Sequence, residues 1–189
     1  MFIFQFTAFP ASGHYCSMAD DDPTADIASA KGIPTLEELL GPEILTTEGV
    51  VPTEEALAGN KVIGIYFAAY WCPPCLSFTP IVSRLYEDLA DAHTDIEIVF
   101  VSCDRTQEQF DEYWGDYMTF PALPYEPRST KTDLGKRFGV KFIPTLIFLD
   151  AETKEIITRS GVDIVEGGVD EQDYVASVRD ALGLEAAVP

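Results

Sequence analysis

Two cysteines separated by two residues, Cys72 and Cys75, carry the clearest chemical signal in the sequence. An apolar run at 62–69 precedes them, and a segment with apolar residues at helical spacing follows. This pattern places the pair where a buried strand ends and a helix begins. Unpaired backbone N–H groups and the helix dipole favour a thiolate at that point, so we expect Cys72 to be the reactive thiol.

The spacing also gives the second cysteine a role. Cys75 is close enough along the chain to attack a mixed disulfide formed at Cys72 and so release the bound partner. Pro73 and Pro74 remove two backbone donors that the first turn of a helix leaves unpaired, and they stiffen the backbone between the thiols. The predicted chemistry is thiol–disulfide exchange, in which Cys72 attacks and Cys75 resolves.

Two other interpretations of the pair are weaker. A structural zinc site needs four ligands, whereas Cys16 and Cys103 each stand alone and the only histidines are His14 and His93. A disulfide with a purely structural role is disfavoured because closing a two-residue ring removes little chain entropy. We therefore expect neither a metal nor any other bound cofactor.

A third element lies far downstream, where the segment Phe142–Thr145 contains Pro144 and leads into an apolar run at 146–149. A proline at the start of a strand suits the edge of a sheet, and an X–Pro bond adopts the cis form at modest cost. Together with the cysteine pair, this segment resembles the thioredoxin superfamily. The resemblance implies that Pro144 is a cis-proline that packs against the reactive disulfide and presents its backbone to an incoming substrate.

The resemblance narrows to the tryparedoxin and nucleoredoxin branch and spans approximately Thr35 to Leu182. It rests on the segments Tyr66–Cys75, Phe78–Pro80, Val99–Arg105, Ala122–Tyr125 and Gly139–Thr145.

Several positions depart from these families. Thioredoxins usually carry a buried aspartate six residues before the first active cysteine, where this chain has Tyr66. The branch commonly has a basic residue after the second cysteine, where this chain has Leu76. Tryparedoxins tend to have a tryptophan and an acidic residue where this chain has Cys103 and Arg105, so that stretch is more similar to nucleoredoxin.

The size and charge of the chain limit its function. At 189 residues, without a repeat or a long polar linker, it is expected to form one domain over 35–185 after an N-terminal extension over 1–34. Twelve basic against 32 acidic residues give a net charge of -20, which excludes nucleic acid as a partner and opposes binding to anionic membranes. No apolar stretch reaches the 18 or more residues of a spanning helix.

The N-terminal extension is expected to be disordered or a targeting segment. Residues 2–9 are apolar like the centre of a signal peptide, but no Lys or Arg precedes them. Met18, followed by an acidic run, is a plausible start for a cytosolic protein. We therefore expect a cytoplasmic protein and leave targeting open, and we expect no catalytic role for Cys16.

The remaining elements follow from periodicity and turn residues. Strands are expected over 62–69, 96–101, 146–149 and 155–158, the last antiparallel to its neighbour. Helices are expected after Cys75, around 110–117, over 130–138 and over 174–182. Ser129 or Thr130 is expected to cap the third helix and Gly139 to end it. Additional elements are expected over 35–60. The fold class is α/β: a thioredoxin fold with a central mixed sheet flanked by helices on both faces.

These expectations define a protein-disulfide reductase that cycles between a dithiol and a disulfide. Its partners are disulfide-containing proteins and a thiol or flavoprotein reductant. Trp71, Pro73 and Pro74 should border the substrate site on one side. Two alternatives remain open: a redox-gated interaction module similar to nucleoredoxin, and an oxidase or isomerase of the secretory pathway.

The opposite side of the site is assigned to residues from the C-terminal half. Ile143 and Pro144 should form a lip where substrate backbone pairs in extended form. Gly161 should complete that lip by letting the substrate approach closely. Cys103 ends the strand beside the active-site strand, so we expect it near the pair, where it could regulate access or be oxidised. The competing interpretation of Cys103 is a small, inert core residue.

Overall fold

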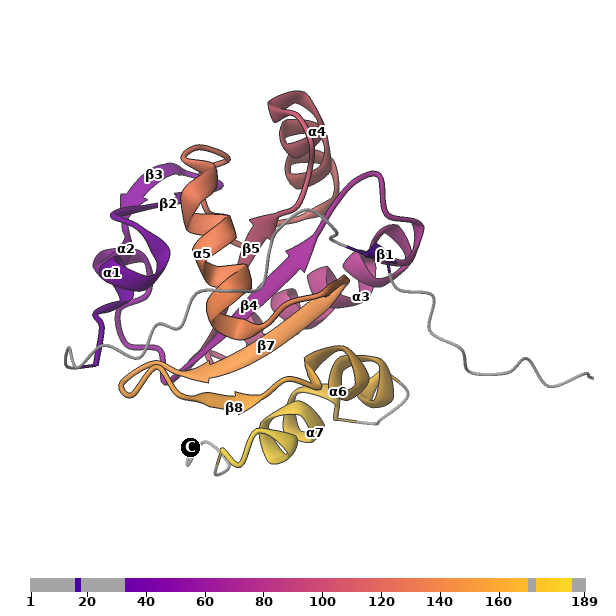
Figure 1. Ribbon diagram of the computed structural model, residues 1–189. Coiled ribbons are helices and arrows are strands. Elements are labelled where there is room, and N and C mark those ends of the chain that lie inside the picture. The colour runs from indigo at the N-terminus through magenta and orange to yellow at the C-terminus, as the bar shows by residue number, and fades with distance from the viewer. Residues whose placement is uncertain (1–15, 18–32, 170–172, 185–189) are drawn as a thin grey trace, which may run out of the picture.

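A four-stranded mixed sheet forms the centre of the computed structural model, which describes residues 16–17, 33–169 and 173–184 (Figure 1). Its strands are β4 (Val62–Ala68), β5 (Ile96–Ser102), β7 (Thr145–Asp150) and β8 (Ile156–Thr158), in the order β5-β4-β7-β8. The two strands β4 and β5 are parallel, whereas β7 is antiparallel to both β4 and β8. Every residue of β4 is buried, because helices cover both faces of the central strands.

Helix α3 (Pro73–Asp91) covers one face, and α5 (Arg128–Phe138) crosses the other (Figure 1). The helices α6 (Gly161–Gly168) and α7 (Tyr174–Ala181) pack against α3, as does α4 (Gln107–Tyr117). The buried side of α3 is an apolar stripe at helical spacing: Phe78, Val82, Leu85 and Leu89. These features confirm the predicted fold class and the predicted antiparallel strand.

The additional N-terminal elements are also present. Helix α1 (Leu36–Leu40) begins with a capping box, in which Thr35 and Glu38 each bind the other's backbone N–H. The strands β2 (Glu43–Thr46) and β3 (Gly49–Pro52) form a hairpin, and α2 (Thr53–Ala56) follows it. Ala122 bridges both β2 and β5, so these elements extend the sheet beyond its β5 edge.

Two helices differ from the sequence-based expectation. Helix α5 begins at Arg128, directly after Pro127, rather than at Thr130 under a Ser129 or Thr130 cap. A proline with its fixed φ starts a helix without any side-chain cap, so the two hydroxyl residues lie inside the first turn. The end at Gly139 was predicted correctly, and this residue has the left-handed φ of 62° that glycine tolerates. Helix α6 was not predicted.

One further pair of strands lies outside the central sheet. Strand β1 (Cys16–Ser17) pairs antiparallel with β6 (Phe142–Ile143), which precedes Pro144. Most of the predicted extension, 1–15 and 18–32, lies outside the described residues. In the part of the chain that the structure describes, no helix is long and apolar enough to cross a membrane.

Candidate active site

The two cysteines of the motif meet at the start of α3. Cys72 is the N-cap residue with extended backbone, and Pro73 and Pro74 occupy the first two helical positions, as the sequence predicted. The two sulfur atoms, Cys72 Sγ and Cys75 Sγ, lie 2.6 Å apart. Both side chains are fully buried, so the pair lies in the protein interior at the end of β4.

The segment before β7 packs against the cysteine pair. The Cys72 thiol donates to the Ile143 carbonyl across a distance of 3.8 Å, and the Ile143–Pro144 peptide bond is cis. Ile143 and Pro144 are both buried, whereas Phe142 is about half exposed. The structure therefore brings Ile143 and Pro144 against the cysteine pair from a position about 70 residues further along the chain.

Two contacts hold Trp71 in place. Its indole N–H donates to the Cys103 carbonyl at 3.1 Å, and the Arg105 guanidinium lies 4.7 Å from the centre of its ring. An arginine over a tryptophan face is a favourable cation–π contact. These contacts attach the residue before Cys72 to the segment that follows β5.

The same segment supplies a buried carboxylate that the sequence analysis did not single out. Asp104 accepts from the Tyr70 backbone N–H at 2.7 Å and from the Ser102 hydroxyl at 2.8 Å. Arg128 donates to the carbonyls of Ser102 and Asp104 and stacks on the Tyr125 ring. Burial raises the pKa of Asp104, and its hydrogen bonds oppose that shift. This network fixes the backbone two residues before Cys72.

Three hydroxyl groups form a buried chain beside Cys75. Thr79, one helical turn after Cys75, bonds to the Tyr66 hydroxyl at 2.8 Å and to the Tyr113 hydroxyl. Burial raises the pKa of both tyrosines, and the charge of Cys75 raises both further. The tyrosines therefore stay protonated near neutral pH and offer hydrogen bonds to the polar groups around them. Tyr66 stands at the sequence position where thioredoxins usually carry a buried aspartate.

Cys103 lies at the same edge of the sheet as the pair, at the end of β5. It is 8% exposed, and burial raises its pKa to about 12 despite the nearby cations Lys131 and Arg128. A thiol that stays protonated is a poor nucleophile, so oxidation of Cys103 should be slow. Its position agrees with the expectation from strand order, while the regulatory role stays a prediction.

Gly161 has a different reason to be glycine from the one we expected. It is buried at the start of α6, and a Cβ atom there would lie 2.5 Å from the Leu146 carbonyl oxygen. The close approach to β7 gives a structural reason for glycine, and the predicted approach of a substrate stays a prediction. Beside it, a cavity of about 190 Å³ opens next to Pro144, lined also by Phe142, Thr145 and Arg159 among others.

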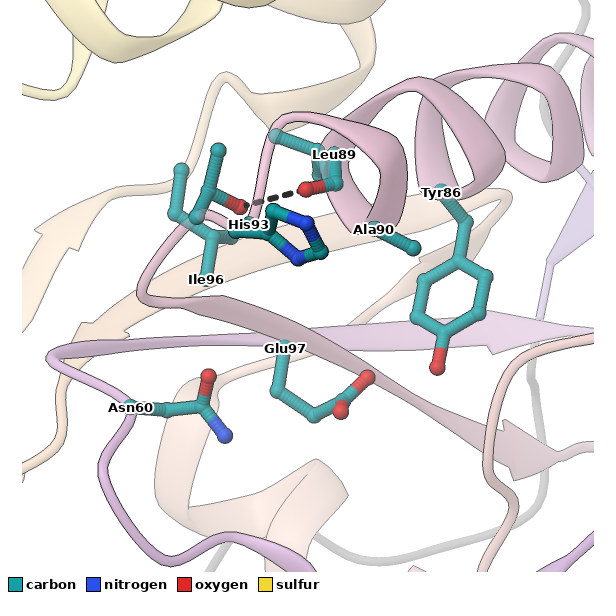
Figure 2. Close-up of a pocket in the computed structure, with 8 residues that line it drawn as sticks. Asn60, Tyr86, Leu89, Ala90, His93, Ile96 and Glu97 are labelled. Atoms are coloured by element: carbon teal, nitrogen blue, oxygen red, sulfur yellow. Dashed lines mark hydrogen bonds between the residues drawn. The ribbon is translucent and has the colours of Figure 1, made fainter. Parts of the chain in front are cut away.

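A second cavity lies far from the cysteines, at the other end of β5 (Figure 2). It measures about 320 Å³, and Glu97 and Tyr86 face each other across it. Burial raises the pKa of Glu97 to about 7. None of the residues that the cysteine motif predicted for the site lines this cavity.

Comparison with known proteins agrees with this geometry. The Thioredoxin-like family profile matches residues 59–156, which include the cysteine pair and the segment around Pro144. The solved structure of tryparedoxin from Trypanosoma brucei is 38% identical, with a TM-score of 0.64, and the match covers 72% of this chain and 94% of that one. The chain belongs to the thioredoxin-like family. Its similarity to nucleoredoxin and tryparedoxin assigns it to that branch of the family.

Two further relatives define that branch. Mouse nucleoredoxin is 39% identical over 128 residues, which make up 68% of this chain but 28% of that protein. The chain therefore spans less than a third of the nucleoredoxin it matches. Tryparedoxin II in complex with glutathionylspermidine is 32% identical, with a TM-score of 0.62, and the match covers 69% of this chain and 91% of that one.

Proposed function

We propose that this thioredoxin-like protein reduces disulfide bonds in protein substrates. The observation that carries the proposal is the position of the two sulfur atoms, 2.6 Å apart at the start of α3, with the Ile143 carbonyl 3.8 Å from Cys72. A dithiol at a helix start accepts a substrate disulfide, and the adjacent sheet edge offers backbone groups to an extended peptide.

The reaction proceeds by two exchanges. The Cys72 thiolate attacks one sulfur of the substrate disulfide, and the other substrate sulfur leaves as a thiolate that takes up a proton. Cys75 then loses its proton and attacks Cys72, which releases the second substrate thiol and leaves a Cys72–Cys75 disulfide. The substrate gains two electrons and two protons, and the protein pair loses them.

A thiol reductant must return the pair to the dithiol state. One relative has been solved in complex with glutathionylspermidine, a low-molecular-weight thiol, which supports a reductant of that chemical class. In this chain, the cation beside Trp71 is Arg105, a residue that attracts a carboxylate on such a thiol more than a polyamine. We therefore propose an anionic thiol such as glutathione, or a flavoprotein reductase, as the source of electrons.

Insulin reduction tests the function and identifies the reductant. The full chain is supplied in turn with NADPH and thioredoxin reductase, with glutathione under NADPH and glutathione reductase, and with dithiothreitol, and insulin precipitation is followed. Acceleration over the reductant alone is expected in at least the dithiothreitol assay. If the reduced chain accelerates none of the three reactions, the proposed reductase function is wrong. Cys103→Ser is the matched control, because it removes a thiol outside the pair.

A further inference from the structure

The strand β1 lies on the sheet edge that the proposed function assigns to the substrate. Cys16 is the partner of Ile143 and Ser17 is the partner of Phe142, in antiparallel register. Ile143 is the residue whose carbonyl lies 3.8 Å from Cys72 Sγ. Figure 1 shows β1 beside the end of α3 that begins with the cysteine motif. A segment of the chain itself therefore pairs with the backbone that an extended peptide substrate would use.

Burial at the site agrees with an occupied edge. Cys72 and Ile143 have no exposed surface. A nucleophile in that state meets no protein disulfide until part of the structure moves away. Strand pairing of only two residues is weak, so this movement costs little compared with opening the central sheet. The short strand is thus suited to being displaced by a substrate.

The two residues of β1 pair with residues that differ in burial. Position 16 lies opposite the fully buried Ile143, whereas position 17 lies opposite Phe142, which is 48% exposed. Residues directly opposite each other on paired strands share a face, and successive residues alternate between faces. The one cysteine in this strand therefore stands at the position whose partner belongs to the site.

We propose that β1 is a tethered substrate mimic that pairs with the edge at Ile143 and that Cys16 forms a reversible disulfide with Cys72. The proposal rests on the proposed function, because it uses the same nucleophile and the same edge. In the oxidised protein, the Cys16 thiolate attacks Cys72 of the Cys72–Cys75 disulfide. Cys75 leaves as a thiolate and takes up the proton that Cys16 lost, so no external oxidant is consumed.

This exchange gives the chain a masked state. While Cys16 is joined to Cys72, no substrate can react there, and Cys75 can reverse the bond by attacking Cys72 again. From the sequence we expected no catalytic role for Cys16, and the proposal gives it a regulatory one. A substrate with a better-pairing extended segment would displace β1, so the edge would select substrates by backbone pairing.

A full-length variant without the resolving thiol tests the proposal directly. Cys75→Ser is treated with oxidised glutathione at neutral pH, quenched with an alkylating agent and mapped by non-reducing peptide mass spectrometry. Glutathione first joins Cys72, and the Cys16 thiolate then displaces it. The expected product is a peptide pair joined through Cys16 and Cys72, with glutathione absent from Cys72. Persistent glutathione on Cys72 with an alkylated Cys16 would overturn the proposal.

A matched variant separates strand register from simple proximity. Cys75→Ser with Cys16→Ser and Ser17→Cys moves the thiol by one residue, from the register position opposite Ile143 to the one opposite Phe142, and leaves the tether length nearly unchanged. Cross-linking to Cys72 should then fall by about tenfold or more, because a misplaced group loses most of its effective concentration. Equal cross-linking by both variants would show a flexible tether without a paired strand, which contradicts the proposal.

The cross-linking and insulin assays together distinguish a failure of this proposal from a failure of the reductase function. If wild-type protein reduces insulin but Cys16 never joins Cys72, the tethered mimic is wrong and the reductase stands. If the cross-link forms while insulin reduction is absent, then protein reduction is wrong and the Cys16–Cys72 exchange stands as a separate property.

Discussion

The two ends of the strand β5 hold different kinds of site. Near its carboxyl end, Asp104 and the cysteine pair are buried and form hydrogen bonds with backbone groups. At its amino end, Glu97 is half-buried in a cavity of about 320 Å³ beside Tyr86 and His93 (Figure 2). Burial raises the pKa of both carboxyl groups. The cavity of about 320 Å³ and the carboxyl group of Glu97, whose pKa is about 7, therefore lie away from the redox chemistry.

The difference lies in what each carboxyl group holds. Asp104 fixes the backbone of Tyr70, two residues before the nucleophile, whereas Glu97 accepts from the N–H of its own neighbour Ile98 at 2.9 Å. A dithiol reacts with large protein substrates at a sheet edge and needs a fixed loop rather than an enclosed pocket. In this fold, backbone positioning identifies the active end better than cavity volume does.

Removal of the nucleophile should have the largest effect. Cys72→Ser is expected to abolish insulin reduction, because Cys75, the other thiol in the first turn of α3, resolves the mixed disulfide and does not attack the substrate. Cys75→Ser should still attack but not resolve, and should accumulate mixed disulfides with substrates. Non-reducing electrophoresis after incubation with oxidised insulin distinguishes the two. Preferential alkylation of Cys75 over Cys72 at mildly acidic pH would reverse the assigned roles.

Loss of the carboxylate at the redox end should rank second. Asp104→Ala leaves the Tyr70 N–H and the Ser102 hydroxyl without their acceptor, and an orphaned buried donor costs about 1–3 kcal/mol of stability. The reductase rate should fall as well, because the loop before Cys72 loses its anchor. Denaturant unfolding and insulin assays measure the two effects.

An exposed aspartate provides the control for this variant. Asp116→Ala, on the exposed side of α4, should leave both unfolding and activity near wild type. If Asp104→Ala lost stability but kept the full rate with folded protein, Asp104 would support the fold without positioning the active-site loop.

The sequence predicted the local part of the site and not the tertiary part. Cys72 and Cys75 are neighbours on one helix turn, so spacing alone specified their roles. Asp104 was missed because its partner Tyr70 lies 34 residues away, and only the parallel pairing of β4 with β5 brings them together. Only the resemblance to the thioredoxin superfamily predicted that Pro144 lies beside the two cysteines.

Some errors also have a local cause. Helix α5 starts earlier than expected because Pro127 replaces a side-chain cap. The contact of Gly161 with Leu146 was missed because a glycine's need for space does not say which neighbour fills it. The pairing of Cys16 with Ile143 has no periodic signal in a strand of two residues.

Glu97 at the other end allows a test of pH-dependent stability. Its pKa rises from an ordinary value of 4.5 to about 7, so the folded protein holds a proton that the unfolded chain has already lost. The contribution to stability is complete below about pH 4.5 and falls as pH rises to about 7. Glu97→Gln should remove this decline and stabilise the protein at pH 8 by about 1–2 kcal/mol.

Chemical unfolding at several pH values measures that difference. The variant and wild type should have similar stability near pH 4 and diverge toward pH 8, with no change in insulin reduction. A parallel loss of reductase activity would break the comparison, because it would join the two ends of β5 functionally.

The smallest effect is expected from the hydroxyl chain beside Cys75. Tyr66→Phe removes one partner of Thr79 but leaves Tyr113 in place, so resolution of the mixed disulfide should slow by about threefold or less. Because the pKa of each tyrosine is raised, both hydroxyls stay protonated and act as donors rather than bases. Tyr66→Phe should therefore lower the rate equally at pH 6.5 and pH 8.5, a uniform loss that stopped-flow tryptophan fluorescence can follow through Trp71. A loss confined to the alkaline side would instead identify a tyrosine that gives up its proton during resolution, and comparison with the single variant Tyr113→Phe would then show which hydroxyl it is.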